Sequence, residues 1–336
     1  MSGIFQTLLS SFSSLISNIA FGSSVSPYIQ VYPWSAGFGA KYSNPSTLPP
    51  GDVKGITINS TKTVIATANF ASPAVNAYPW TTSGFGTKYA NPSTAVPING
   101  LSISFSPSGN DIVAGSSSSV YLYAYPWSSG FGTKYSNPST LPAGSVFGVT
   151  FNSAGTVIAV ASGSPPYLAA YPWSSGFGTK YANPATAPTG NGRCVAFNPA
   201  GTSVAIGHLT SPYVSAYPWS AGFGTKYSNP ATLPTGGGNG VTFNPAGTAI
   251  ALAHTTSPYV SAYPWSSGFG TKYSNPATLP WNDGNGVAFD STGTTIAIAN
   301  TSTPTTAVYP WSAGFGVKYS DPSSPPTNSS FAVSFF

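Results

Sequence analysis

Tyr-Pro-Trp occurs seven times in this chain, at a nearly constant spacing of 46 residues. Its tryptophans are Trp34, Trp80, Trp127, Trp173, Trp219, Trp265 and Trp311, and a single interval, between the second and the third, is 47 residues. Repeats of this length are typical of architectures that use one supersecondary unit many times over. We therefore expect seven copies of one unit, arranged as a single structure of 336 residues rather than as two unrelated domains.

Each copy has the pattern of four short strands separated by turn residues. In the sixth copy, an alternating run at 241–243 ends at Pro-Ala-Gly, and an apolar run follows at 249–253. A second alternating run covers 259–263, and a fourth segment covers 269–273 after a glycine. Short alternating runs bounded by Gly, Pro, Asn and Ser predict strands. Four strands per unit predict a closed, all-β, seven-bladed β-propeller of four-stranded blades.

One part of the repeat resembles the WD40 family. The segment Ile103-Ser-Phe-Ser-Pro-Ser-Gly109, followed by an apolar run and a strand that ends in Trp, is similar to a WD40 unit. Here Ser or Thr follows the tryptophan where that family has Asp, and the opening Gly-His pair is absent from its place, so the family's buried polar tetrad is not carried over. The repeats also resemble those of repeat proteins from tailed bacteriophages.

The two ends of the chain are expected to meet in one blade. The run 333–335 follows Trp311 by the same offset at which 287–289 follows Trp265. The C-terminal strand 331–336 should therefore supply the inner strand that the first copy lacks, which closes the ring and indicates that the C-terminus is complete. We divide the chain into an N-terminal segment, 1–17, and the propeller, 18–336.

The N-terminal segment 1–17 is predicted to form a short amphipathic helix or arm. Its apolar residues recur at steps of three and four, which is helical spacing. It is too short and too rich in serine to span a bilayer, and it lacks the marks of a signal peptide. Two roles remain open: a helix docked over one face of the propeller, or an arm that docks onto a neighbouring subunit.

Composition offers few groups for catalysis. Charged residues make up only 4% of the chain, which has no glutamate, and the net charge of +5 is too sparse for a nucleic-acid surface. The acids are Asp52, Asp111, Asp283, Asp290 and Asp321, the histidines are His208 and His254, and the one cysteine, Cys194, lies in a strand-like run. No spacing suits zinc, and no glycine-rich segment forms a phosphate loop. We therefore expect no enzyme, no metal and no cofactor.

The seven copies agree best in the outer motif Tyr-Pro-Trp-(Ser/Thr)-x-Gly-Phe-Gly-x-Lys-Tyr-x-(Asn/Asp)-Pro. It predicts a ring of lysines and tyrosines: Lys41, Lys88, Lys134, Lys180, Lys226, Lys272, Lys318, Tyr42, Tyr89, Tyr135, Tyr181, Tyr227, Tyr273 and Tyr319. One interpretation is structural, with tryptophan between blades and the glycines in tight bends. The other is a repeated binding ring, in which seven weak equivalent contacts gain avidity.

These observations favour a non-enzymatic, virion-associated structural or attachment protein of a tailed bacteriophage, located on a virion or extracellular surface. A lectin-type propeller that binds glycans through Trp, Lys and Tyr is the first alternative, and an intracellular WD40-type scaffold is the second. The expected partners are other virion or surface proteins, and also a glycan under the first alternative, with no specific nucleic acid and no membrane span. Assembly through the N-terminal arm is a further expectation.

Overall fold

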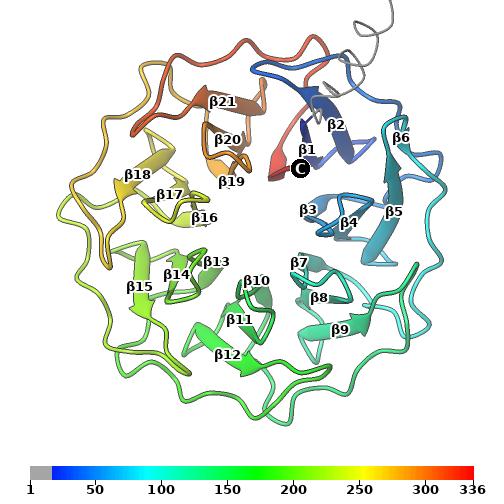
Figure 1. Ribbon diagram of the computed structural model, residues 1–336, viewed down its shortest axis with the longest axis horizontal. Coiled ribbons are helices and arrows are strands. Elements are labelled where there is room, and N and C mark those ends of the chain that lie inside the picture. Colours follow the sequence, from blue (N-terminus) through cyan, green and yellow to red (C-terminus); the bar gives the residue numbers. More distant parts are fainter. Residues whose placement is uncertain (1–16) are drawn as a thin grey trace, which may run out of the picture.

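The computed structural model describes residues 17–336, which form a closed seven-bladed β-propeller (Figure 1). The helix expected over 1–17 lies outside the described residues, except for Ser17, which begins a strand. Blade 1 contains β22 (Ser330–Phe335), β1 (Ser17–Ser23) and β2 (Ile29–Trp34), and blade 2 contains β3 (Val53–Ile58), β4 (Val64–Asn69), β5 (Val75–Thr81) and β6 (Gly84–Phe85). Blade 3 contains β7 (Gly100–Phe105), β8 (Asp111–Ser116) and β9 (Leu122–Pro126), and blade 4 contains β10 (Val146–Phe151), β11 (Val157–Ser162) and β12 (Leu168–Pro172). Blade 5 contains β13 (Gly192–Phe197), β14 (Ser203–His208) and β15 (Val214–Pro218), and blade 6 contains β16 (Gly238–Phe243), β17 (Ala249–His254) and β18 (Val260–Pro264). Blade 7 contains β19 (Gly284–Phe289), β20 (Thr295–Asn300) and β21 (Thr306–Pro310).

The two chain ends share blade 1. β22 pairs antiparallel with β1, from Ile19 opposite Phe335 to Ser23 opposite Ser330. Beyond this ladder, the backbone N–H of Asn18 donates to the carbonyl of Phe336 at 2.7 Å, and the N–H of Phe336 donates back at 3.0 Å. β22 contacts the inner strands of blades 7 and 2, so the inner strands form an unbroken ring around the centre.

The middle strand of each blade is buried because a neighbouring blade covers each of its faces. β17 shows the pattern: its alanines, Ala249, Ala251 and Ala253, pack against isoleucine and valine of blade 7. Its large residues, Ile250 and Leu252, face the opposite way and pack against alanine and valine of blade 5. A small face thus meets a large face at each of these two interfaces, which allows the blades to pack closely.

The fourth strand predicted for each blade is largely reduced to a single bridge. Only β6 is a strand, and the other six blades have an isolated antiparallel bridge between the motif Trp and Phe, as between Trp265 and Phe269. In blade 6 the N–H of Gly270 donates to the carbonyl of Pro264 at 2.8 Å, and the equivalent bond in blade 2, from Gly86 to Pro79, is also 2.8 Å. Because the proline is common to all seven copies, the feature that distinguishes the blade with the outer strand is the extra residue of blade 2 at 81–83.

Aromatic side chains fill the outer part of each interface between blades. Trp265 lies 5.1 Å from Phe269 and 5.1 Å from Phe243 of its own blade, and 5.4 Å from Tyr227 of the preceding blade, measured between ring centroids. All three pairs are edge-to-face, the preferred arrangement of aromatic rings. The contact between Tyr319 and Trp34, at 5.1 Å, continues the series across the junction of blades 7 and 1.

Candidate functional site

Every inner strand carries a β-bulge at the same position, at the mouth of the central channel. In blade 5, Gly192 pairs with His208 and Cys194 pairs with Gly207, so the residue between them, Arg193, has no partner in the ladder. The equivalent residues of all seven blades form what we call the mouth ring: Lys54, Leu101, Phe147, Arg193, Asn239, Asn285 and Phe331. A bulge releases a side chain from the regular alternation of the strand, and bulges are common beside functional sites.

The mouth ring lines a cavity of 350 Å³ together with Phe70, Leu209 and Thr255. This volume lies in the range typical of small-molecule pockets. Small residues follow each ring position and allow the inner strands to approach closely. A Cβ added at Gly148, for example, would lie 2.8 Å from the Cα of Cys194 in the next blade. The blades thus hold the ring side chains around one opening.

Below the mouth, the lining of the channel continues along the inner strands. The residues two positions after the mouth ring are β-branched: Ile56, Ile103, Val149, Val195, Val241, Val287 and Val333. Five of these side chains, from Ile103 to Val287, are at most 9% exposed, so they offer little surface to the channel. We call the cavity at the mouth the cup, and we expect a ligand to enter it from the outer side.

Lys54 is the first of two cations in the cup. Its Nζ lies 3.0 Å from the centroid of Phe331 and 4.4 Å from that of Phe70, and 3.3 Å from Asp52 Oδ2. Burial lowers the pKa of Lys54, and the Asp52 carboxylate opposes this shift. The ammonium group is thus placed over aromatic faces and beside a carboxylate.

Arg193, the only arginine of the chain, is the second cation and lies three blades away from Lys54. Its guanidinium carbon lies 4.4 Å from the centroid of Phe147, and burial lowers its pKa. Arg193 Nε is buried and makes no hydrogen bond within residues 17–336. A buried donor without an acceptor is costly to folding, so this atom is a candidate contact for an anionic ligand.

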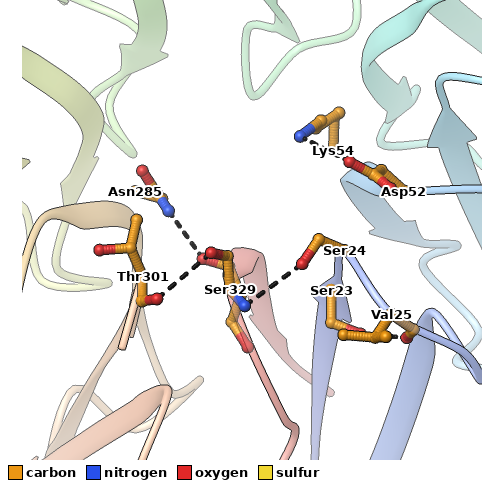
Figure 2. A network of polar contacts seen from close by, with 9 residues as sticks. Ser23, Ser24, Val25, Asp52, Lys54, Asn285, Thr301 and Ser329 are labelled. Carbon is orange, nitrogen blue, oxygen red and sulfur yellow. Dashed lines mark hydrogen bonds and ion pairs between the residues drawn. The ribbon is translucent and has the colours of Figure 1, made fainter. Parts of the chain in front are cut away.

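The part of the cup between Arg193 and blade 1 is polar and neutral. Asn239 Nδ2 donates to the carbonyl of Gly284 at 3.2 Å, and Asn285 Nδ2 donates to that of Ser330 at 2.9 Å. Figure 2 shows Asn285 beside the hydrogen bond from Ser329 Oγ to the carbonyl of Thr301, with Lys54 and Asp52 across the opening. One side of the cup therefore presents amides and hydroxyls, whereas the other presents Leu and Phe.

The predicted rim ring lies far from this cup, along the outer segment of each blade. Each lysine is half-buried and donates to the Asn or Asp three residues later: Lys41 to Asn44, Lys88 to Asn91, Lys134 to Asn137, Lys180 to Asn183, Lys226 to Asn229, Lys272 to Asn275 and Lys318 to Asp321. Each motif tyrosine packs on the tryptophan of the next blade, and the tryptophans are 4–7% exposed. Whether this ring also binds an acidic partner or a polymer stays a prediction.

The two histidines and the cysteine lie in strands outside the lining of the cup, except that Cys194 follows Arg193 directly. His208 and His254 are fully buried in β14 and β17, and burial lowers the pKa of each to about 4. Burial raises the pKa of Cys194 to about 12, which leaves its thiol protonated. Within residues 17–336, no three His, Cys, Asp or Glu side chains gather as metal ligands would. That part of the chain also contains no helix with the length and apolar character needed to cross a membrane.

Known structures of the same architecture include lactonases. The periplasmic gluconolactonase of Pseudomonas aeruginosa superimposes with a TM-score of 0.73 at 14% identity, over 95% of this chain and 99% of that one. A candidate 6-phosphogluconolactonase from Bacteroides uniformis gives 0.73 at 13% identity, over 96% and 99% of the two chains. A protein from Lactobacillus plantarum gives 0.74 at 10% identity, over 96% and 99%. The fold is thus that of a seven-bladed β-propeller.

No protein-family model and no curated protein sequence matches the chain. The resemblances to WD40 and to phage repeat proteins therefore find support only in the coarser sense of a propeller fold. The named neighbours contradict the expected non-enzymatic virion or attachment protein, and also the lectin-type alternative, because they are lactonases. One is periplasmic, which contradicts the expected location on a virion or extracellular surface.

These expectations failed for a physical reason. They relied on the absence of a catalytic motif within any one segment of the chain. The mouth ring takes one residue from each of seven blades, about 46 positions apart, so no single segment contains its pattern. One signal was nevertheless present: in each inner strand a residue of variable chemistry stands between two small or β-branched ones, as in Val53-Lys54-Gly55 and Gly192-Arg193-Cys194.

Proposed function

We propose that this propeller is a lactonase-type hydrolase that opens a small lactone in the cup and holds the resulting hydroxy carboxylate there. The observation that carries the proposal is the pair of partly desolvated cations, Lys54 and Arg193, in the cup of a chain with only 4% charged residues. Seven of the ten basic residues lie on the rim, and two of the other three lie in the cup. The names of the structural neighbours favour the same reaction class.

Lactone hydrolysis is accelerated by a positive group that stabilises the charge on the carbonyl oxygen and by a base that activates the attacking water. As water attacks the carbonyl carbon, negative charge develops on the carbonyl oxygen, and a nearby cation stabilises it. Lys54 and Arg193 supply such charge, and we assign the role of base, which accepts a proton of the water, to Asp52, the carboxylate paired with Lys54. The ring C–O bond then breaks, and Asp52 returns that proton to the departing oxygen, which becomes the hydroxyl of the hydroxy acid.

The cup also suits the product. The carboxylate formed by ring opening is an acceptor for the guanidinium of Arg193, including the buried Nε, and for the ammonium of Lys54. Asn239 and Asn285 offer side-chain oxygens to a hydroxyl of the ligand. The β-branched layer below the mouth limits the depth of the ligand.

The test is proton release from lactones, measured in a pH-stat and corrected for spontaneous hydrolysis, with glucono-δ-lactone, δ-nonalactone and dihydrocoumarin. The wild-type chain should accelerate at least one of them. Asp52→Asn should lower kcat by roughly 10²–10⁴-fold, as expected for loss of a general base, and Arg193→Gln should lower kcat/KM. Lys62→Asn, in the exposed turn at the far end of β3, is the control. Rates equal to the buffer rate for all three lactones would overturn the proposal.

A further inference from the structure

The cup is divided into an apolar side and a polar side, and this division goes beyond the reaction itself. Around the mouth from blade 1 to blade 5, the lining residues are Phe331, Lys54, Phe70, Leu101, Phe147, Arg193 and Leu209. Five of these seven are large and apolar, and Phe70 is 40% exposed. On the other side, blades 6 and 7 contribute Asn239, Thr255 and Asn285.

The polar side consists of three short side chains that are already partly hydrogen-bonded to the protein. Each asparagine uses one of the two N–H donors of its Nδ2 on a backbone carbonyl, at 3.2 Å for Asn239 and 2.9 Å for Asn285, and Thr255 Oγ1 accepts from the N–H of Gly237 at 3.1 Å. A sugar lactone carries hydroxyls on nearly every carbon, and several of them would lie against Phe and Leu without partners. Removing such hydroxyls from water without a replacement bond is unfavourable, and sites discriminate strongly on this basis.

The cations are arranged for an anion that has an apolar neighbour. Lys54 and Arg193 each lie over a phenylalanine ring, at 3.0 Å and 4.4 Å from its centroid. A carboxylate bound to either cation therefore has an aromatic face directly beside it, where an alkyl chain or aromatic ring can pack. An open chain with a hydroxyl on nearly every carbon has less apolar surface to place against such a face than an alkyl or aromatic group has.

We infer that the cup selects amphipathic lactones, with an alkyl or aromatic group attached to the ring, over fully hydroxylated sugar lactones. This inference rests on the proposed function, because it names the class of ligand that the same cup binds. Phe70, Leu101 and Phe147 receive the apolar group, Arg193 or Lys54 holds the carboxylate after ring opening, and the oxygens of Asn239 and Asn285 receive the hydroxyl that opening releases.

Binding of the open-chain products tests the inference independently of catalysis. Titration calorimetry would compare 3-(2-hydroxyphenyl)propionate with gluconate, two carboxylates that differ in their apolar area and number of hydroxyls. The wild-type chain should bind the aromatic acid at least tenfold more tightly. Leu101→Asn should reduce that preference by about tenfold, and it suits the bulge because asparagine is native at this position in blades 6 and 7. Leu141→Asn, at an exposed leucine of an outer connection, is the matched control.

Each outcome decides between the two proposals. Tighter binding of the aromatic acid, lost in Leu101→Asn and kept in Leu141→Asn, supports the inference even if no lactone is hydrolysed, in which case only the proposed reaction fails. Equal or tighter binding of gluconate overturns the inference, and hydrolysis of glucono-δ-lactone would then leave the reaction standing. Failure of both acids to bind overturns the inference and removes product binding from the proposed function.

Discussion

Trp173 Nε1 donates a hydrogen bond to Asp111 Oδ2 at 3.2 Å, across the interface between blades 3 and 4. The other carboxylate oxygen accepts from the hydroxyl of Tyr135 at 2.8 Å. Burial and the bond to Asp111 raise the pKa of Tyr135 to about 12. Blades 2 and 4 have valine at the position of Asp111, whereas blade 5 has Ser203, whose hydroxyl lies 3.3 Å from that of Tyr227.

Replacing Asp111 with valine should therefore destabilise the propeller modestly. Asp111→Val removes two hydrogen bonds to a charged acceptor but places at this position a residue that two other blades accept. We expect the free energy of unfolding to fall by about 1–3 kcal/mol in urea titrations. Asp290→Asn is the matched control. Asp290 Oδ1 accepts hydrogen bonds from two backbone N–H groups in a turn of blade 7, and Asn244 Oδ1 accepts the two equivalent bonds in blade 6, so asparagine fits this position. An unchanged midpoint for Asp111→Val would show that the link contributes nothing.

Two buried histidines should make stability depend on pH. His208 Nε2 lies 3.1 Å from Ser215 Oγ, and His254 Nε2 lies 3.0 Å from Ser261 Oγ. Their pKa of about 4 in the fold lies below the ordinary value of 6.5, so the unfolded chain binds more protons between these values. The free energy of unfolding should be highest above pH 6.5 and fall as the pH drops toward 4, by up to about 3 kcal/mol per histidine.

The double variant His208→Asn, His254→Asn isolates this effect. Asparagine is native at the equivalent positions of blades 2 and 7, as Asn69 and Asn300, and it does not titrate in this range. Thermal unfolding between pH 4 and 7 should give a clearly flatter profile for the variant. A profile as steep as that of the wild type would assign the pH dependence to other groups.

The last residue should contribute strongly to ring closure. Phe336 is 5% exposed, its ring lies 5.4 Å from that of Trp80 in blade 2, and its backbone pairs with Asn18. Phe336→Ala should lower the free energy of unfolding by about 3–5 kcal/mol, the usual cost of removing a buried phenylalanine. Hydrogen exchange should rise first in β1 and β22. Val317→Ala, at a residue that is 83% exposed, should leave both measurements within error of the wild type.

The rim lysines should matter much less for stability than the tryptophans beside them. Lys272 is half-buried and donates to Asn275 at the surface, where such contacts are weak. Lys272→Met should change the free energy of unfolding by at most about 1 kcal/mol, whereas Trp265→Ala should cost about 3–5 kcal/mol. If Lys272→Met alone lowered the free energy of unfolding by several kcal/mol, the hydrogen bond between Lys272 and Asn275 would be an important stabiliser of the outer segment, contrary to this expectation.

The closed seven-bladed propeller could be predicted because its evidence is local and repeated. Trp265 and its six equivalents fix the number of blades, and the Gly and Pro residues between short apolar runs fix the turns. The shortness of the outer strand could not be predicted from Pro264, because the same proline is present in blade 2, where the strand forms. The hydrogen bond between Asp111 and Trp173 could not, because it joins residues 62 positions apart at an angle set by blade packing.

The candidate site could not be predicted as one site for a different reason. Lys54 and Arg193 are 139 positions apart and share no motif, and the bulge that turns both side chains into the cup exists only when the inner strand pairs with its neighbour. The repeated rim motif predicted a binding site at residues such as Lys272 and Tyr273. In the structure, Lys272 donates to Asn275 and Tyr273 packs on Trp311, so both side chains have partners within the protein. In a repeat protein, the position at which the copies differ in chemistry can carry more functional information than the position at which they agree.

A crystal structure with bound 3-(2-hydroxyphenyl)propionate would show whether the mouth of the channel is the ligand site. We expect the carboxylate within hydrogen-bonding distance of Arg193 Nε or Lys54 Nζ, with the ring against Leu101 and Phe147. Arg193→Gln crystals soaked in the same way should show weaker occupancy or none. A ligand bound on the rim, or one in the mouth that touches neither cation and persists in Arg193→Gln, would contradict this expectation.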